Sequence, residues 1–326
     1  MDELHVVFGA GQVGGILAGR LLDLGKRVRI VSRTGPGAPG GAERVLGDAM
    51  DAGFCRDQGR GAVAIYHCLN APYRARAWAE CLPTLAANLV EAAGRVGARL
   101  VVLDNLYALG RPRGRLLDED VSMNPCSRKG EIRARIGEAL FAAHQRGDAR
   151  VTMGRASDFY GPGGLQTHFG ERFWKPALSG RTVPLWMELD TPHSYHYLRD
   201  VARGLAILGM SEEDVCGRAW MLPCAPAGST RELVARLAHE VGRPIRVRSM
   251  PPVAARILGW GAPLLREVAE MSYQWEEPFV VDDRRFRSRF GLEATPVAEA
   301  ARETVEWAVE TYRSGGPAGS AARAPR

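Results

Sequence analysis

The strongest constraint on the fold is an apolar run that leads into a glycine-rich turn at the start of the chain. Residues 4–8 read Leu-His-Val-Val-Phe, and the next residues match the spacing G-x-G-x-x-G. An apolar helical pattern begins directly after them. In a strand–turn–helix unit this spacing brings backbone amides up to a pyrophosphate at the N-terminus of the helix. We therefore predict a dinucleotide-binding turn made by Gly9, Gly11, Gln12, Val13 and Gly14.

Strand-like and helical patterns alternate through the first half of the chain. The expected strands cover residues 4–8, 27–31, 44–46, 61–67, 99–103 and 150–153, with long helical patterns at 73–95 and 127–146. Such alternation is typical of a doubly wound parallel α/β sheet, the Rossmann fold. We predict that residues 1–165 form a dinucleotide-binding domain of this kind.

Beyond residue 165 the pattern becomes irregular and richer in aromatic residues and proline. The expected elements are helices at 199–209, 231–241, 252–273 and 296–313, and short strands near 220–222 and 245–247. We predict a smaller, mixed α/β substrate-binding domain over residues 166–313, partly interwoven with the first. The Gly/Ala/Pro-rich residues 314–326 predict a disordered tail.

The end of the second strand indicates which dinucleotide binds. A Rossmann domain that prefers NAD carries an acid about 20 residues after the glycines, whereas an arginine there suits the 2′-phosphate of NADP. Here the chain reads Ser32-Arg33-Thr34, without an acid. We predict NADP, with NAD possible. Asp48, after the third strand, either approaches the adenine or belongs to the cap of the next helix.

Composition indicates which partners and which cellular compartment to expect. The 326-residue chain has a net charge of +6, but its arginines are interspersed with acids and no basic block alternates with aromatics. We expect no nucleic-acid partner. No apolar run approaches the length of about 20 residues that spans a membrane. The six cysteines form no C-x-x-C pair, which favours reduced thiols in a cytoplasmic protein.

Several stretches together resemble the NAD-dependent epimerase/dehydratase branch of the short-chain dehydrogenase/reductase superfamily. They are the glycine turn and residues 104–110 (DNLYALG), 127–131 (SRKGE), 155–163 (RASDFYGPG) and 193–202 (HSYHYLRDVA). The resemblance covers nearly the whole chain up to about residue 313. It implies an enzyme in which a tyrosine moves the substrate proton and a lysine, matched here by Lys129, binds the nicotinamide ribose.

Departures from the family pattern fall at the catalytic positions. Pro125 stands where the family has its tyrosine, and Asn105 stands where it has a serine or threonine. Lys129 is one of only three lysines in an arginine-rich chain, which favours a functional role. Tyr107 is the leading replacement for the proton donor, with Tyr160 and Cys126 as weaker ones. Asn105 could polarise a carbonyl, and Asp104 could act as a general base or stabilise a loop.

The stretch from His193 to Tyr197 contains two histidines, which suggests a metal site. However, no accompanying cluster of Cys, His or carboxylate residues has the spacing of metal ligands. We predict no metal, and we expect Tyr160, His193 and Tyr195 to border a small-molecule substrate. The helices at 73–95 and 127–146 carry apolar stripes that suit either the core or a homodimer. The leading hypothesis is an NADP-dependent reductase, epimerase or dehydratase acting on a hydroxyl- or carbonyl-bearing small molecule. The alternative is a non-catalytic NADP(H)-binding redox sensor or scaffold.

Overall fold

A seven-stranded sheet, parallel throughout, organises the molecule. The computed structural model describes residues 3–35, 37–250 and 263–313. In spatial order the strands are β11 (Ala219–Met221), β6 (Arg150–Arg155), β5 (Arg99–Asp104), β4 (Ala62–His67), β1 (Leu4–Phe8), β2 (Arg27–Ser32) and β3 (Glu43–Leu46). Each neighbouring pair is parallel. The strand order reverses between β1 and β4, so the predicted doubly wound fold is confirmed.

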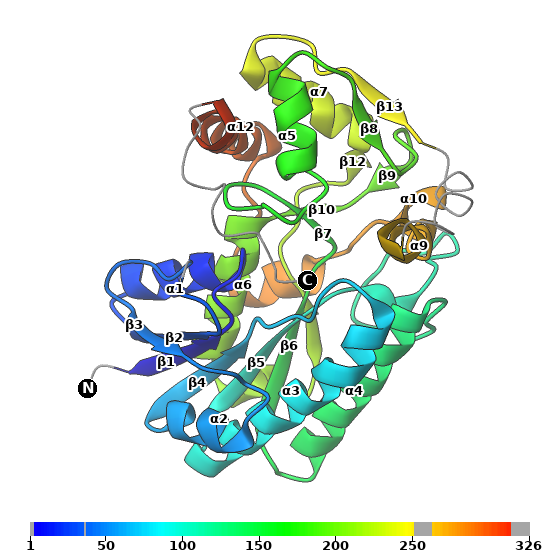
Figure 1. The fold of residues 1–326 in the computed structure, drawn as a ribbon. Coiled ribbons are helices and arrows are strands. Elements are labelled where there is room, and N and C mark those ends of the chain that lie inside the picture. Colours follow the sequence, from blue (N-terminus) through cyan, green and yellow to red (C-terminus); the bar gives the residue numbers. More distant parts are fainter. Residues whose placement is uncertain (1–2, 36, 251–262, 314–326) are drawn as a thin grey trace.

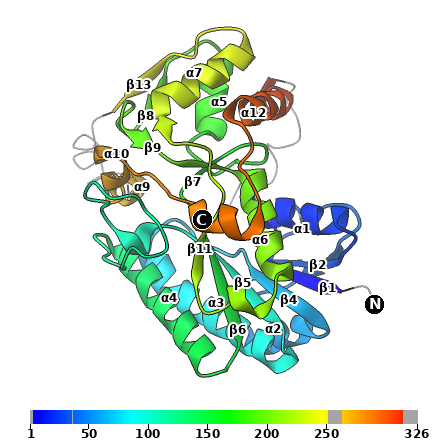
Figure 2. The same cartoon turned by 180° about the vertical axis from the view of Figure 1, so that it is seen from behind.

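Helices cover both faces of this sheet, which explains why its central strands are almost continuously apolar. Val6 and Phe8 of β1 face α2 (Ala52–Gly59), α3 (Ala75–Val96) and α4 (Arg128–Gln145). Val7 points to the opposite face, toward α1 (Gly14–Asp23) and α6 (Leu198–Met210). Figure 1 shows α3 and α4 in front of the sheet, and Figure 2 shows α6 over its other side.

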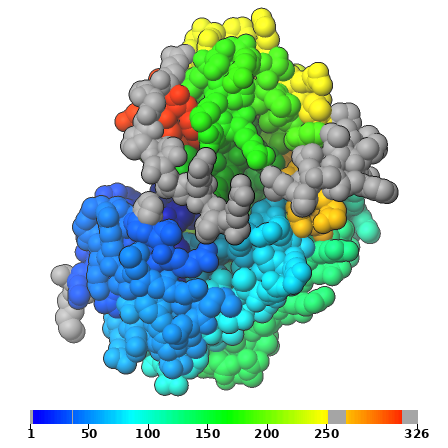
Figure 3. Space-filling view, viewed as in Figure 1, coloured from blue at the N-terminus to red at the C-terminus, as the bar shows by residue number. Residues whose placement is uncertain are grey.

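A second, smaller unit lies beyond the carboxyl ends of the strands (Figure 1). Its core packs α5 (Glu171–Leu178), α7 (Thr230–Val241) and α12 (Val297–Arg313) against the parallel pair β8 (Val183–Leu185) and β13 (Val247–Ser249). Figure 3 shows this unit above the Rossmann unit in the same view.

Several short elements complete the described structure. They are the parallel pair β7 (Asp158–Tyr160) and β10 (Tyr195–Tyr197), the antiparallel pair β9 (Pro192–His193) and β12 (Gly228–Ser229), the helices α9 (Pro263–Ala269), α10 (Tyr273–Glu276) and α11 (Arg284–Phe290), and 3₁₀ turns at Tyr107–Leu109 and Glu213–Val215.

One expected strand lies in a different place from the one the sequence suggested. Residues 220–222 were predicted to belong to the smaller unit, but β11 pairs with β6 and becomes the seventh strand of the main sheet. Trp220 packs there against Phe286 and Phe290 of α11, so the chain returns twice to the Rossmann unit. Of the helix expected at 252–273, residues 251–262 lie outside the described residues, as does the predicted tail 314–326. The division into domains at residue 165 stays a prediction.

Candidate active site at the carboxyl edge of the sheet

The three glycines after β1 have different reasons to be glycine. Gly9 has a φ of +110°, and a Cβ there would lie 2.7 Å from the carbonyl oxygen of Cys68. A Cβ on Gly14 would lie 1.8 Å from the carbonyl oxygen of Gly9. Gly11, by contrast, has no atom within 4 Å of the position its Cβ would take. The turn is thus closed by Gly9 and Gly14 and open at Gly11, which leaves room for a pyrophosphate at the start of α1.

Gln12 and Val13 have separate roles in the turn. Val13 is buried in the core on the α1 face of the sheet. The side-chain oxygen of Gln12 accepts a hydrogen bond from the backbone of Gln166 at 3.2 Å. This contact ties the loop after β7 to the glycine turn.

The residues after β2 and β3 lie at the other end of the expected dinucleotide. Ser32 donates through Oγ to the carbonyl oxygen of Thr34 at 2.5 Å, and Arg33 is exposed. Asp51 caps α2 by accepting from the backbone of Phe54 at 3.1 Å. Asp48 accepts from the backbone of Met50 at 3.0 Å, so it shapes the turn before that cap. Contacts of Arg33 and Asp48 with a cofactor stay predictions.

Two tyrosines meet at the ends of β4 and β5. The hydroxyls of Tyr73 and Tyr107 are 3.3 Å apart, and Tyr107 stacks on Trp78 with ring centroids 6.0 Å apart. Asn105 accepts through Oδ1 from the backbone of Tyr107 at 3.0 Å, so it fixes the turn that carries this tyrosine. Burial, followed by the charge of Asp158, raises the pKa of Tyr107 above its usual range. Tyr107 therefore carries its proton at neutral pH.

Asp104, at the end of β5, is a buried carboxylate with two arginine partners. Its oxygens lie 3.6 Å from Nη1 of Arg133 and 3.4 Å from Nε of Arg155. The Arg133 guanidinium also lies 4.8 Å from the centre of the Trp78 ring. These two ion pairs hold β5, β6 and α4 together. They weigh against a role of Asp104 as a general base, because its carboxylate is already paired. That role was predicted from sequence and remains a prediction.

Lys129 lies in the first turn of α4, after the N-cap Ser127, whose Oγ accepts from the backbone of Gly130 at 3.0 Å. Its side chain is fully buried. The Nζ atom contacts carboxylate oxygens of Glu267 at 2.6 Å and Glu270 at 2.7 Å, and it sits 4.8 Å from the Tyr73 ring centre. The resemblance predicts this ammonium at a ribose, and that role is still a prediction.

Asp158 and two histidines, of which His193 is buried, form a polar group beside the carboxyl edge of the sheet. Asp158 of β7 accepts from Nε2 of His193 at 3.0 Å and lies 3.5 Å from Nε2 of His168. Nδ1 of His193 lies 3.1 Å from the carbonyl oxygen of Gln274, and its ring stacks on Trp275. Burial pushes the pKa of Asp158 upward, but the hydrogen bonds and charges of the two histidines outweigh it and hold that pKa well below its usual range.

Tyr160, His193 and Tyr195, the predicted substrate residues, line one cavity of about 380 Å³. The Tyr195 hydroxyl bonds to Oγ1 of Thr230 at 2.7 Å and accepts from the indole of Trp275 at 3.1 Å. None of Asp104, Asn105, Tyr107 and Lys129 belongs to this lining. The structure thus gathers the predicted residues into two neighbouring groups, with Asp158 between them.

Sequence reasoning missed Tyr73, Asp158, His168, Glu267 and Glu270. Tyr73 follows the fourth strand, where a polar aromatic residue should have been considered, and Asp158 lies inside a quoted motif. No local pattern marks Glu267 or Glu270, since their partner is Lys129, far away in the sequence.

The described residues hold neither a metal-binding cluster nor a membrane-spanning helix. In residues 3–35, 37–250 and 263–313, no group of three or more His, Cys, Asp or Glu side chains could hold a metal ion. Within the same ranges no helix is both long and apolar enough to cross a bilayer.

The open side of the glycine turn gives a direct test of cofactor binding. We expect Gly11→Ala to fold normally, because its methyl meets no atom within 4 Å, yet to weaken NADPH binding at least about tenfold by filling the space the pyrophosphate needs. Fluorescence titration and thermal unfolding measure the two effects. Gly19→Ala, in α1 just after the turn and with equally open space, should change neither. Unaltered NADPH affinity in Gly11→Ala would remove the turn from the cofactor site.

Several solved structures that are similar to this one are enzymes bound to NAD. UDP-glucose 4-epimerase from Thermus thermophilus, in complex with NAD, has a TM-score of 0.74 at 19% identity, covering 94% of this chain and 99% of its own. UDP-glucuronic acid 4-epimerase from Bacillus cereus, with NAD, has a TM-score of 0.78 at 14% identity, covering 96% and 99%. dTDP-glucose 4,6-dehydratase from Bacillus anthracis, with NAD, has a TM-score of 0.77 at 12% identity, covering 96% and 98%.

Sequence comparison gives the family. A search of curated protein sequences finds no significant match. The model of the NAD dependent epimerase/dehydratase family matches residues 5–221, more than half of the chain. This match confirms the resemblance and favours an enzyme that uses a nicotinamide dinucleotide over a non-catalytic sensor. The chain belongs to the NAD dependent epimerase/dehydratase family.

Proposed function

We propose that this protein is an NADP-dependent oxidoreductase, or an epimerase or dehydratase that uses the same redox step, acting on a hydroxyl- or carbonyl-bearing small molecule. The observation that carries the proposal is the open glycine turn at Gly11, with exposed Arg33 and no acid at the end of β2. A guanidinium there matches a 2′-phosphate. The solved relatives are complexes with NAD, so NAD remains the competing cofactor.

The tyrosine pair supplies the proton chemistry. A bound nicotinamide dinucleotide donates or accepts hydride at the substrate carbon. Tyr107 follows β5 and meets Tyr73 at the carboxyl edge of the sheet, so we assign it the role of proton donor to a carbonyl oxygen in the reductive direction. Tyr73, 3.3 Å away, orients that hydroxyl. Asn105 positions Tyr107 through its backbone contact, and Asp104 is the counter-charge of two arginines.

The cavity lined by Tyr160, His193 and Tyr195 is the proposed site for the part of the substrate remote from the reacting carbon, because Tyr107 does not belong to its lining. Its volume of about 380 Å³ lies within the range of small-molecule sites. The similar solved structures include an epimerase named for a UDP-sugar and a dehydratase named for dTDP-glucose. By analogy with these enzymes, we propose a sugar-like substrate. The experiment is a saturation-transfer screen of the NADPH-loaded protein against a metabolite library, followed by turnover assays on the hits. Binding without turnover would favour the sensor.

Cofactor preference depends on Arg33. We expect Arg33→Asp to weaken NADPH binding by at least about tenfold and to leave NADH binding nearly unchanged, because only NADPH presents a 2′-phosphate. Parallel fluorescence titrations with the two cofactors measure this. Arg60→Asp makes the same charge change just before β4, at the opposite edge of the sheet, and should affect neither. Equal affinities for both cofactors in the wild type would contradict the NADP assignment.

The proton donor is tested on any substrate the screen provides. We expect Tyr107→Phe to lower kcat roughly a hundredfold or more, the usual contribution of general acid catalysis, while NADPH affinity stays the same. Steady-state kinetics, followed by the absorbance of the reduced nicotinamide, measure this. Trp78→Phe, which keeps an aromatic ring beneath Tyr107, is the packing control. Full activity in Tyr107→Phe would exclude this tyrosine as the donor.

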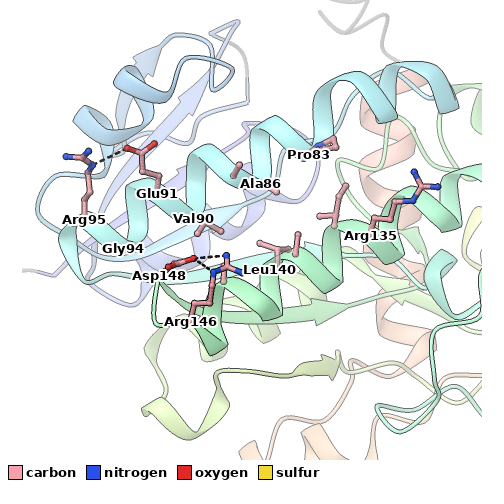
Figure 4. A pocket seen from close by; sticks show the side chains of 14 residues that line it. Pro83, Ala86, Val90, Glu91, Gly94, Arg95, Arg135, Leu140, Arg146 and Asp148 are labelled. Atoms are coloured by element: carbon pink, nitrogen blue, oxygen red, sulfur yellow. Dashed lines mark hydrogen bonds and ion pairs between the residues drawn. The ribbon is translucent and has the colours of Figure 1, made fainter.

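We also propose a homodimer in the cytoplasm, formed through α3 and α4. Between these helices lies an apolar groove of about 660 Å³, floored by Ala86, Val90 and Leu140 (Figure 4). Its rim carries both signs of charge, including the pair Arg146–Asp148. A rim that holds both signs can match a two-fold copy of itself, which is the commonest form of assembly. All six cysteines are free thiols, in keeping with a reducing compartment.

Assembly is tested by placing a charge in the groove. We expect the wild type to be a dimer at micromolar concentration and Ala139→Glu to be a monomer, because a buried carboxylate without a partner is costly. Light scattering coupled to size exclusion gives the mass. Ala298→Glu, the same change at an exposed position of α12, should remain a dimer. A monomeric wild type would reject the interface.

A further inference from the structure

Two carboxylates of α9 and the residue that follows it are fixed at the N-termini of two helices of the Rossmann unit. Oε2 of Glu267 accepts from the backbone of Ala75, the first residue of α3, at 3.1 Å. Oε1 of Glu270 accepts from the backbone of Arg128, the first residue of α4, at 2.5 Å. Helix N-termini favour negative charge, so α9 is held by both dipoles.

Lys129 lies between these carboxylates with every ammonium hydrogen in use. Its Nζ contacts Oε2 of Glu267 at 2.6 Å, Oε2 of Glu270 at 2.7 Å and the carbonyl oxygen of Glu267 at 3.1 Å. An ammonium has three donors, and its side chain is 0% exposed. In this arrangement Lys129 has no hydrogen left to donate to a ribose hydroxyl.

The position of this group along the sheet edge assigns it to one half of the dinucleotide. The glycine turn follows β1, and Arg33 follows β2 on the adenosine side. In a doubly wound sheet the second nucleoside then lies over the other half, toward β4 and β5. Tyr73 and Tyr107 follow those strands, and Lys129 lies 4.8 Å from the Tyr73 ring centre. Glu267 is therefore at the nicotinamide end.

Glu267 retains the acceptor that a ribose needs. Its Oε2 already accepts from Lys129 and Ala75, whereas Oε1 has no partner among the residues that the structure describes. The side chain is 14% exposed, unlike Lys129 beneath it. Glu270 has one partner on each oxygen. Carboxylate oxygens accept strongly from ribose hydroxyls.

We propose that Glu267, and not Lys129, binds the hydroxyls of the nicotinamide ribose. Lys129 is the positioning residue beneath it, whose charge holds α9 against α3 and α4. The inference rests on the proposed function, because it requires a dinucleotide at the glycine turn. It moves the ribose contact from a donor on α4 to an acceptor on α9.

The test compares two probes that differ at the nicotinamide end. NADP⁺ carries the second ribose, and 2′,5′-ADP carries only the adenosine half. In Glu267→Gln we expect the Kd for NADP⁺ to rise about tenfold and that for 2′,5′-ADP to stay within about twofold, because the charge-assisted hydrogen bonds are lost at one end only. Glu270→Gln removes an ion pair to the same lysine but leaves Oε1 of Glu267, so its NADP⁺ affinity should change less. Isothermal titration calorimetry measures the affinities of the wild type and both variants for both probes.

Each other outcome overturns the proposal. Equal weakening of both probes means that Glu267 only stabilises the fold, and equal effects of the two variants mean that the ion pair matters and the free oxygen does not. Unchanged or tighter NADP⁺ binding means that the carboxylate does not accept from the ribose. If Glu267→Gln fails to fold, Glu267→Asp keeps the charge for Lys129 and withdraws the oxygens, with the same expected selectivity. A wild type that binds neither NADP⁺ nor 2′,5′-ADP, nor NAD⁺ and ADP in their place, rejects the proposed function itself.

Discussion

The ion cluster of Lys129 with Glu267 and Glu270 is the interaction on which the candidate site depends. It joins the first turns of α3 and α4 to α9 and the residue after it, which lie 138 and 141 residues beyond Lys129 in the chain. A buried ammonium without partners would be strongly destabilising, so α9 must pack here for Lys129 to be tolerated. The carboxylate of α9 in turn is held by the N-terminus of α3.

Two other carboxylates at the carboxyl edge of the sheet are also paired with basic side chains. Asp104 is satisfied by Arg133 and Arg155, and Asp158 by His193 and His168. Each group neutralises a carboxylate near the expected reaction centre, and Tyr107 is left among them as a phenol whose raised pKa keeps its proton. If Pro125 replaces the family's tyrosine, as the resemblance predicts, Tyr107 is the group that we propose as proton donor in its place.

The sequence was sufficient for features that depend on local pattern. The strands, the long helices and the glycine turn follow from apolar periodicity and glycine spacing, and the family match confirms the resemblance. It was not sufficient for contacts between distant segments. The sequence around Lys129 does not indicate that Glu267 and Glu270 pair with it. In the same way, the sequence around Asp104 does not indicate its ion pairs with two arginines. β11 was placed in the wrong unit for the same reason, because a three-residue apolar strand does not reveal which sheet it joins.

The central claim is that one dinucleotide spans the carboxyl edge from the glycine turn to α9. Hydrogen–deuterium exchange of the protein with and without its preferred nicotinamide dinucleotide tests this most directly, because it maps the footprint without knowledge of the substrate. The account predicts slower exchange at residues 10–15, 69–73 and 266–271 together, with the outer faces of α3 and α4 unchanged. Protection confined to the glycine turn would contradict the claim, as would protection that leaves residues 266–271 unaffected or faster in exchange.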